Sequence, residues 1–273
     1  MNMKRLLGFL SVLALLITAC RDQQATIPYG NNPAAGKYYN IRGIKMYCEI
    51  YGEGTPLLMI HGNGGSMEAF KKNVPFFSKK YKVILVDSRA HGKSVDPSDS
   101  LTFEQMADDF NALLDTLHAA KCYVIGWSDG GINALLLAMR HPDKVIKLAS
   151  TGANLTPDST ALLPSLWKDM VKQYNEQKNI KWKTAKEKND WKIFMLDYDQ
   201  PNIPAVALRG VNCPALIICG DHDLIPIDHT ALIYHNIPKA YMWVVPNSGH
   251  PTLIEHTDDF NRIVNDFFMG KGF

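Results

Sequence analysis

Short apolar runs recur along most of the chain and alternate with longer amphipathic segments. The runs lie at 45–51, 56–60, 82–86, 123–125, 145–149, 215–219 and 241–245. Continuous apolar runs of this length are typical of strands that are buried on both faces of a sheet. Because amphipathic segments separate them, the pattern predicts an α/β fold with a mostly parallel central sheet flanked by helices. The run at 45–51 is expected to be an early antiparallel strand.

Three of the amphipathic segments carry clear helix signals. Residues 102–118 open with Thr102-Phe103-Glu104-Gln105, which is a capping-box pattern. Residues 132–140 are strongly helical and stop before Pro142, as expected ahead of a proline. Residues 258–268 gather aromatic and branched side chains on one face, which predicts a final amphipathic helix.

The segment 156–204 breaks this alternation. It has no clear apolar run, and it contains Trp167, Trp182, Trp191 and many lysines. Because it is too long for a plain loop, we predict a helical cap at about 155–205, inserted over the carboxyl edge of the sheet. The tryptophans are expected to form the core of this small layer, with a pocket-lining role as the alternative. The lysines are expected to form a solvated face.

The N-terminal residues have the pattern of an export signal. Basic residues at 4–5 precede the apolar stretch 6–17, which is too short to span a bilayer comfortably. The stretch ends in Ile17-Thr18-Ala19-Cys20, which resembles a bacterial lipobox. We therefore predict a lipoprotein signal peptide at 1–19, and a lipidated Cys20 with a flexible tether at 20–37.

That pattern predicts an exported bacterial membrane lipoprotein, held on the periplasmic side or in the outer membrane by its acyl chains. The alternative is an ordinary signal peptide cut near Ala19. The remainder, 38–273, fits one domain of this 273-residue chain.

Composition and net charge exclude some classes of function. The net charge is only +2 and there is no long basic run, so no nucleic-acid partner is expected. Cys48, Cys122, Cys213 and Cys219 are expected to act as small apolar side chains. No Cys/His spacing suggests a zinc site.

The strongest chemical signal is Gly126-Trp127-Ser128-Asp129-Gly130, which follows the run 123–125 and precedes a helix signal. This strand–turn–helix context is the one that the GxSxG nucleophile motif requires. The turn is so tight that larger side chains beside Ser128 would collide, which explains the two glycines. The helix start beneath the serine favours developing negative charge. Ser128 is therefore the predicted nucleophile.

Four further motifs, each after a predicted strand, make the chain similar to the α/β-hydrolase superfamily over 38–268. They are His61-Gly62-Asn63-Gly64-Gly65, Asp87-Ser88-Arg89-Ala90-His91-Gly92-Lys93-Ser94, Gly220-Asp221-His222-Asp223-Leu224-Ile225-Pro226 and Asn247-Ser248-Gly249-His250. The resemblance implies the α/β-hydrolase fold and a serine hydrolase with the order Ser, Asp, His along the chain. It implies neither a metal nor an organic cofactor.

The resemblance also assigns roles to residues. His250 would be the general base, and Asp223 the acid that orients it, with Asp221 as the rival. The backbone N–H groups of Asn63 and Asp129 would hold the oxyanion. The segment 87–94 is expected to brace loops rather than to act in catalysis, and its Ala90 stands where the family commonly has glycine.

The predicted reaction is hydrolysis of a small-molecule carboxylic ester through an acyl-enzyme. The string 126–131 is similar to that of the biphenyl-hydrolase-like enzymes, including valacyclovir hydrolase, in which the aspartate after the serine helps to bind an amino group. By that resemblance Asp129, with its neighbour Trp127, is a candidate substrate-binding residue. The alternative is that Asp129 contributes only its N–H, while its carboxylate joins a local hydrogen-bond network.

Two other functions stay open at this point. The same fold and nucleophile serve hydrolases that cleave a carbon–carbon bond in meta-cleavage products. A membrane-tethered binding protein on a hydrolase scaffold is the alternative from another class.

Overall fold

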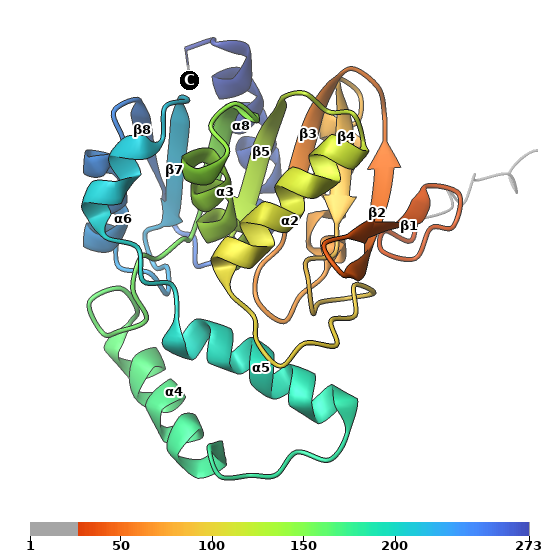
Figure 1. Cartoon of the computed structure of the whole chain (residues 1–273). Coiled ribbons are helices and arrows are strands. Elements are labelled where there is room, and N and C mark those ends of the chain that lie inside the picture. The colour runs from red at the N-terminus through yellow and green to blue at the C-terminus, as the bar shows by residue number, and fades with distance from the viewer. Residues whose placement is uncertain (1–26, 273) are drawn as a thin grey trace, which may run out of the picture.

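An eight-stranded sheet organises residues 27–272, the part of the chain that the computed structural model describes (Figure 1). The strands are β1 (Gly36–Ile41), β2 (Ile44–Tyr51), β3 (Thr55–Ile60), β4 (Tyr81–Val86), β5 (Cys122–Trp127), β6 (Val145–Thr151), β7 (Ala215–Gly220) and β8 (Ala240–Val245). Their spatial order is β1-β2-β4-β3-β5-β6-β7-β8. β2 pairs antiparallel with β1 and β4, and every other pairing is parallel. The predicted α/β fold is confirmed.

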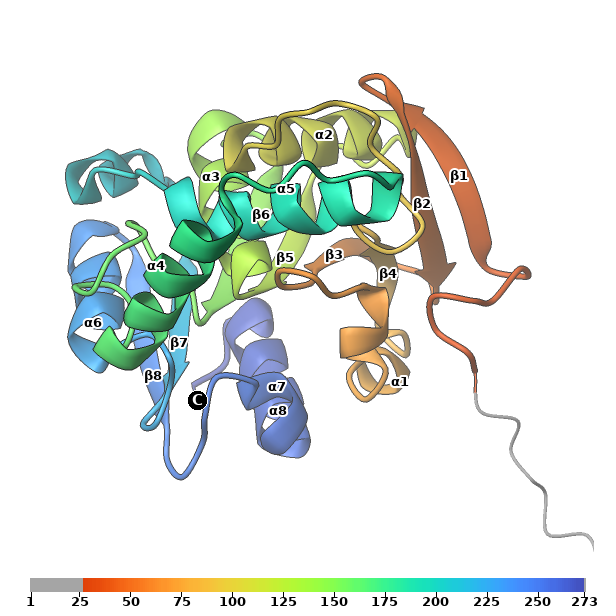
Figure 2. The ribbon, with the colours of Figure 1, turned by 90° about the horizontal axis from the view of Figure 1, so that it is seen from below.

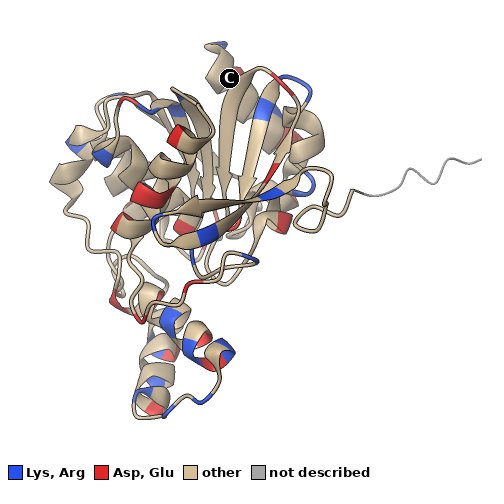
Figure 3. Ribbon diagram, turned by 45° about the vertical axis from the view of Figure 1, so that its right-hand side comes forward, with Lys and Arg blue, Asp and Glu red and all other residues tan. Residues whose placement is uncertain are grey.

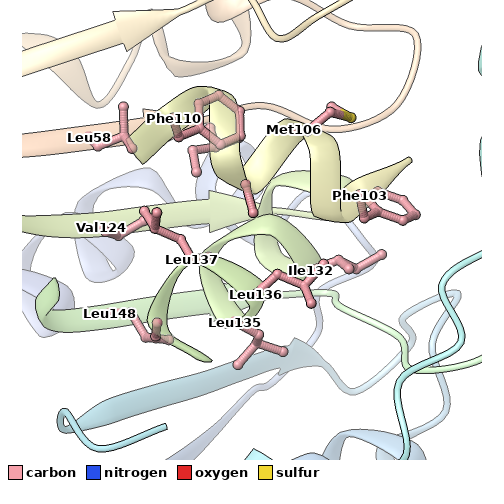
Figure 4. Close-up of a cluster of buried hydrophobic side chains, with 14 of the residues drawn as sticks. Leu58, Phe103, Met106, Phe110, Val124, Ile132, Leu135, Leu136, Leu137 and Leu148 are labelled. Atoms are coloured by element: carbon pink, nitrogen blue, oxygen red, sulfur yellow. The ribbon is translucent and has the colours of Figure 1, made fainter. Parts of the chain in front are cut away.

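Helices cover both faces of the sheet (Figure 2). Side chains of α2 (Phe103–Thr116), α3 (Asp129–Arg140) and α6 (Ile227–Asn236) join one core cluster, and those of α1 (Val74–Phe77), α7 (Thr252–Glu255) and α8 (Thr257–Met269) join the other. Short 3-10 turns lie at η1 (Met67–Phe70) and η2 (Ala205–Gly210). In the first cluster, Leu58 and Val124 of the sheet lie beneath Phe110 of α2 and Leu137 of α3 (Figure 4). The predicted helix start at Thr102 is confirmed, because its hydroxyl accepts the amide of Gln105 at 3.0 Å.

The cap consists of α4 (Pro164–Gln177) and α5 (Ala185–Asp199), which lie within the predicted range and stand apart from the sheet (Figure 1). Their aromatic side chains stack on one another, with Trp167 against Tyr198 at 5.5 Å and Trp191 against Phe194 at 5.1 Å between ring centroids. Charges of both signs are spread over the two helices (Figure 3). The tryptophans thus pack against other aromatic side chains of the cap, but all three stay half-buried and do not form the enclosed core that was expected.

The N-terminal part of the described chain differs from the predicted tether. The amides of Gly30 and Asn32 donate to the buried Glu49 carboxylate, each at 2.9 Å, and Tyr29 packs edge-on against Tyr51. β1 then begins at Gly36. The segment from residue 29 to residue 37 is therefore docked on the sheet, because Glu49 supplies acceptors that the sequence pattern did not reveal.

The predicted signal peptide and the predicted lipid acceptor Cys20 lie outside the described residues and stay predictions. Over residues 27–272, no helix has the length and apolarity that a bilayer crossing needs. The four cysteines in this range are free thiols, and Cys48, Cys122 and Cys219 are buried, as expected for small apolar side chains.

Candidate active site

Ser128 lies on a sharp turn between β5 and α3, with φ 57° and ψ −121°. This left-handed backbone is strained for a residue with a side chain. A Cβ on Gly126 would lie 2.0 Å from the carbonyl oxygen of Gly130, and a Cβ on Gly130 would lie 1.9 Å from that of Ile60. Both motif glycines are therefore required by close backbone approach, which supports the interpretation of the sequence motif.

His250 and Asp223 are brought together from two loops at the carboxyl ends of β8 and β7. The imidazole Nδ1 donates to Asp223 Oδ1 at 2.6 Å. The buried Asp223 carboxylate also accepts the amides of Ile225 at 3.1 Å and Gly220 at 3.3 Å, so its orientation is fixed. With Nδ1 protonated, Nε2 is left as the basic nitrogen of the ring.

The rival carboxylate, Asp221, has a different set of partners. Its oxygens accept the amides of Asn247 at 2.9 Å and Ser248 at 3.0 Å, and these hydrogen bonds lower the pKa of Asp221 to about 2. Glu255 accepts the next amide, that of Gly249, at 2.8 Å. Asp221 and Glu255 thus hold the loop that carries His250 through its backbone amides, whereas Asp223 contacts the imidazole.

Two further residues support the imidazole. The Trp127 indole donates to the backbone carbonyl of His250 at 3.1 Å. Gly152, at the end of β6, has φ +65°, and a Cβ there would lie 2.7 Å from His250 Cε1. No sequence pattern marks Gly152, because only the packing of the histidine loop against β6 reveals the contact.

The loop after β3 lies against Ser128, the predicted nucleophile. A Cβ on Gly62 would lie 2.9 Å from Ser128 Cβ. Among residues 27–272, the amides of Asn63 and Asp129 donate to no backbone carbonyl or side chain. Two unpaired N–H groups next to a nucleophile are the arrangement that an oxyanion hole requires.

The side chains of these two residues also meet. Asn63 Nδ2 donates to Asp129 Oδ2 at 3.0 Å and to the carbonyl of Ile193 in α5 at 3.2 Å. A third residue, Asp197 of α5, hydrogen-bonds the Asp129 carboxyl group. Burial raises the pKa of Asp129, and burial together with the Asp129 charge raises the pKa of Asp197 well above its usual range. Sequence reasoning missed Asp197, which lies far along the chain in the cap.

A cavity of about 560 Å³ opens between the elbow and the cap. Ser128, His250, Asn63 and Trp127 line it from the catalytic core. The cap adds apolar side chains, including Leu166, Met170, Ile193 and Phe194. The residues that line it in the described part of the chain include Asp129, Asp190 and Asp197 but no lysine or arginine. The cavity can therefore hold a small, partly apolar molecule next to Ser128.

The segment 87–94 lies outside this cavity and makes structural contacts. Asp87 accepts the amides of Met67 at 3.0 Å and Lys93 at 2.8 Å. Arg89 is buried and donates to Asp109 at 2.6 Å and Asp96 at 3.1 Å. These contacts match the predicted loop brace.

Ala90, in the same segment, has φ 67°. This left-handed conformation explains why the family commonly has glycine at its position. The substitution leaves the Asp87 and Arg89 contacts in place.

Known proteins with similar sequences agree with this geometry. A sequence model described as the alpha/beta hydrolase fold matches residues 55–179. The chain is 28% identical over 246 residues to serine hydrolase BPHL of Mus musculus, with 84% of each chain covered. It is 27% identical over 270 residues to a 2-hydroxymuconate semialdehyde hydrolase of Pseudomonas sp. strain CF600, covering 87% of this chain and 95% of that one.

Solved structures agree on the fold. A meta-cleavage product hydrolase from Pseudomonas fluorescens matches with TM-score 0.70 at 23% identity, covering 88% of this chain and 99% of that one. Carboxylesterase CesB from Bacillus subtilis matches with TM-score 0.69 at 17% identity, covering 87% and 92%. The eight-stranded sheet, the sharp turn at Ser128 and these matches show that the chain has the α/β-hydrolase fold, and its relatives support a hydrolase of that fold.

Proposed function

We propose that the protein hydrolyses a small-molecule carboxylic ester through an acyl-enzyme on Ser128. The observation that carries the proposal is the 2.6 Å hydrogen bond from His250 Nδ1 to Asp223, in a cavity that Ser128 also lines. An imidazole oriented in this way has its basic Nε2 available to accept the serine proton.

The proposed reaction has two steps. In the first, Ser128 Oγ attacks the ester carbonyl while His250 accepts its proton, and the N–H groups of Asn63 and Asp129 hold the oxyanion. The intermediate collapses, and the alcohol leaves with the proton from the imidazolium. In the second, His250 takes a proton from water while the hydroxyl attacks the acyl-enzyme, and the imidazolium then returns that proton to Ser128 Oγ as the acid is released. The carboxylate of Asp223 stabilises the imidazolium in both steps.

The test is burst and steady-state release of p-nitrophenol from short-chain esters by the purified protein. Wild type is compared with Ser128→Ala, His250→Ala and Asp221→Asn. The first two substitutions are expected to abolish turnover. Asp221→Asn is a control for the neighbouring carboxylate, which braces the loop without touching the imidazole. Turnover that survives Ser128→Ala would refute the proposal.

Recognition of an ammonium group by the Asp129 carboxylate is a narrower version of this proposal. The absence of lysine and arginine from the described cavity lining supports it. The hydrogen bonds of Asp129 to Asn63 and Asp197 instead support a local network. If Asp129→Asn lowers activity equally on amino-acid esters and plain acyl esters, selective recognition of an amine is wrong.

Cleavage of a carbon–carbon bond is the second candidate, because several relatives are hydrolases of meta-cleavage products. The names of those compounds, such as 2-hydroxy-6-oxo-6-phenylhexa-2,4-dienoate, denote carboxylates. A cavity with three aspartates and no described cation favours a neutral or cationic substrate over such an anion. Assaying a dienoate of this type beside the p-nitrophenyl esters distinguishes the two reactions.

A non-catalytic binding protein is the remaining alternative. It predicts no turnover of any ester by a folded wild type, together with ligand binding that Ser128→Ala leaves unchanged.

A further inference from the structure

Helix α5 of the cap contacts the rest of the domain along its length. Asn189 donates to the carbonyl of Ala90 at 2.8 Å, Lys192 donates to Asp96 at 2.7 Å, and Leu196 is buried in the core. In addition, the carbonyl of Ile193 accepts from Asn63, and Asp197 hydrogen-bonds Asp129. These last two contacts join the cap to the two residues whose backbone N–H groups are the proposed oxyanion donors.

The Asp129–Asp197 contact needs a proton. Two carboxylates cannot hydrogen-bond unless one of them is protonated, and their mutual repulsion opposes the ionisation of both. Burial and the neighbouring charge raise the pKa of Asp197, so the pair retains a proton to higher pH than a free aspartate would.

The groups around the pair shift the pKa of its carboxyl groups in both directions. His91 and His250 lower the pKa of Asp129 by their charge when protonated, and the Asn63 amide lowers it by donating a hydrogen bond. Burial keeps His91 mostly neutral, because it lowers the pKa of that imidazole to about 4. Asp190 lines the same cavity and adds negative charge. No lysine or arginine in the described cavity lining favours ionisation of both carboxyl groups, so the pair keeps its proton.

We propose that Asp197 is a positioning residue for the proposed reaction: through the proton that it shares with Asp129, it ties the cap helix to the oxyanion loop and the nucleophile elbow. The side chains of Asn63 and Asp129 are bonded to each other and to α5, and their N–H groups are thereby held toward Ser128. This inference rests on the proposed ester hydrolysis.

Loss of the shared proton would break the hydrogen bond between Asp197 and Asp129. Above the pKa of the pair, two adjacent carboxylates repel each other, and α5 loses its contact with Asp129. The oxyanion donors then move away from their best positions, so kcat falls on the alkaline side, while binding of a small neutral ester changes little. Removing one oxyanion donor typically costs about a hundredfold to a thousandfold in rate, so partial misplacement of both predicts a loss of about tenfold or more.

The experiment compares kcat and KM for p-nitrophenyl butyrate across the pH range for wild type, Asp197→Asn and Asp197→Ala. The asparagine amide can donate to Asp129 at every pH, so Asp197→Asn is expected to keep most of kcat and to lack the alkaline decline. Asp197→Ala is expected to lose about tenfold or more in kcat at all pH values. Asp199→Asn, an exposed change on the same helix, is the matched control and should keep the wild-type profile.

An alkaline decline that is unchanged in Asp197→Asn, or a wild-type kcat in Asp197→Ala, would overturn the proposal. Hydrogen exchange of the α5 amides, corrected for the intrinsic pH dependence, supplies a readout that needs no activity. Protection of the α5 amides should fall at high pH in wild type and persist in Asp197→Asn. This comparison tests the proposal even if Asp197→Ala folds poorly. If wild type turns over no ester, the proposed function fails by itself, and a pH-independent α5 would separately refute the tie.

Discussion

Replacing Gly152 by alanine tests the position of His250, the proposed general base, without substituting any of the three proposed triad residues. Gly152 has φ +65°, and an added Cβ would lie 2.7 Å from Cε1 and 2.9 Å from Nδ1 of His250. Carbon atoms in contact stay about 3.5 Å apart, so the methyl group would push the ring by about 0.8 Å. The imidazole cannot move this far and keep its 2.6 Å hydrogen bond to Asp223 undistorted.

The expected effect has two parts. A displacement of about 1 Å costs roughly a hundredfold in rate, so kcat should fall by one to two orders of magnitude. The left-handed backbone also costs about 1–2 kcal/mol for a residue with a Cβ, offset by about 0.4–1 kcal/mol because alanine lowers the entropy of the unfolded chain. The free energy of unfolding should therefore fall by about 1 kcal/mol.

Gly43→Ala is the matched control. Gly43 lies in the β1–β2 turn with φ +89°, and an added Cβ there meets nothing within 4 Å. It should therefore reproduce the loss of stability and leave kcat unchanged. The assay is steady-state p-nitrophenol release, with urea unfolding of both variants. Wild-type kcat in Gly152→Ala, with the expected stability loss, would show that the reasoning about His250 is wrong.

Four other outcomes are expected. Ala90→Gly removes the strain energy of a left-handed backbone, about 1–2 kcal/mol, but increases the entropy of the unfolded chain at a cost of about 0.4–1 kcal/mol. The urea midpoint of unfolding should therefore rise slightly, and a lower midpoint would contradict this. Burial lowers the pKa of His61 and His91 to about 4, so on acidification these histidines bind protons in the unfolded chain before they do so in the folded protein. The free energy of unfolding should therefore fall as the pH drops from 6.5, by up to roughly 3 kcal/mol per histidine. Equal unfolding free energies at pH 7.5 and 5 would argue against this. Burial raises the pKa of three thiols, to about 12 for Cys122 and to about 11 for both Cys213 and Cys219, so accessibility decides their order of reaction. A thiol reagent should label the half-buried Cys213 before the buried Cys122 and Cys219, as peptide mapping would measure. Cys20→Ser should move the protein out of the detergent phase, and unchanged partitioning would speak against lipidation.

The sequence determined the fold class and the centre of the site through local patterns. Apolar runs of five to seven residues correspond to β2, β3, β4, β6, β7 and β8. The inner strands β3, β4 and β7 are largely buried on both faces and need apolar side chains on both sides, whereas the edge strand β8 is mostly half-buried. The elbow at Ser128 was readable because its glycines are demanded by contacts within the turn and with the adjacent strand. The order of the motifs along the chain assigned Asp223 and His250 to neighbouring loops.

Only the tertiary structure decided contacts between segments that are distant in sequence. It brings Asp223 rather than Asp221 to the imidazole, because the direction in which each side chain leaves the loop after β7 depends on how that loop packs. It places Gly152 against His250, docks residues 29–37 on Glu49, and carries Asp197 of the cap to Asp129. Periodicity and motif spacing describe one element at a time, whereas these contacts arise from the way in which loops and the cap settle on the sheet.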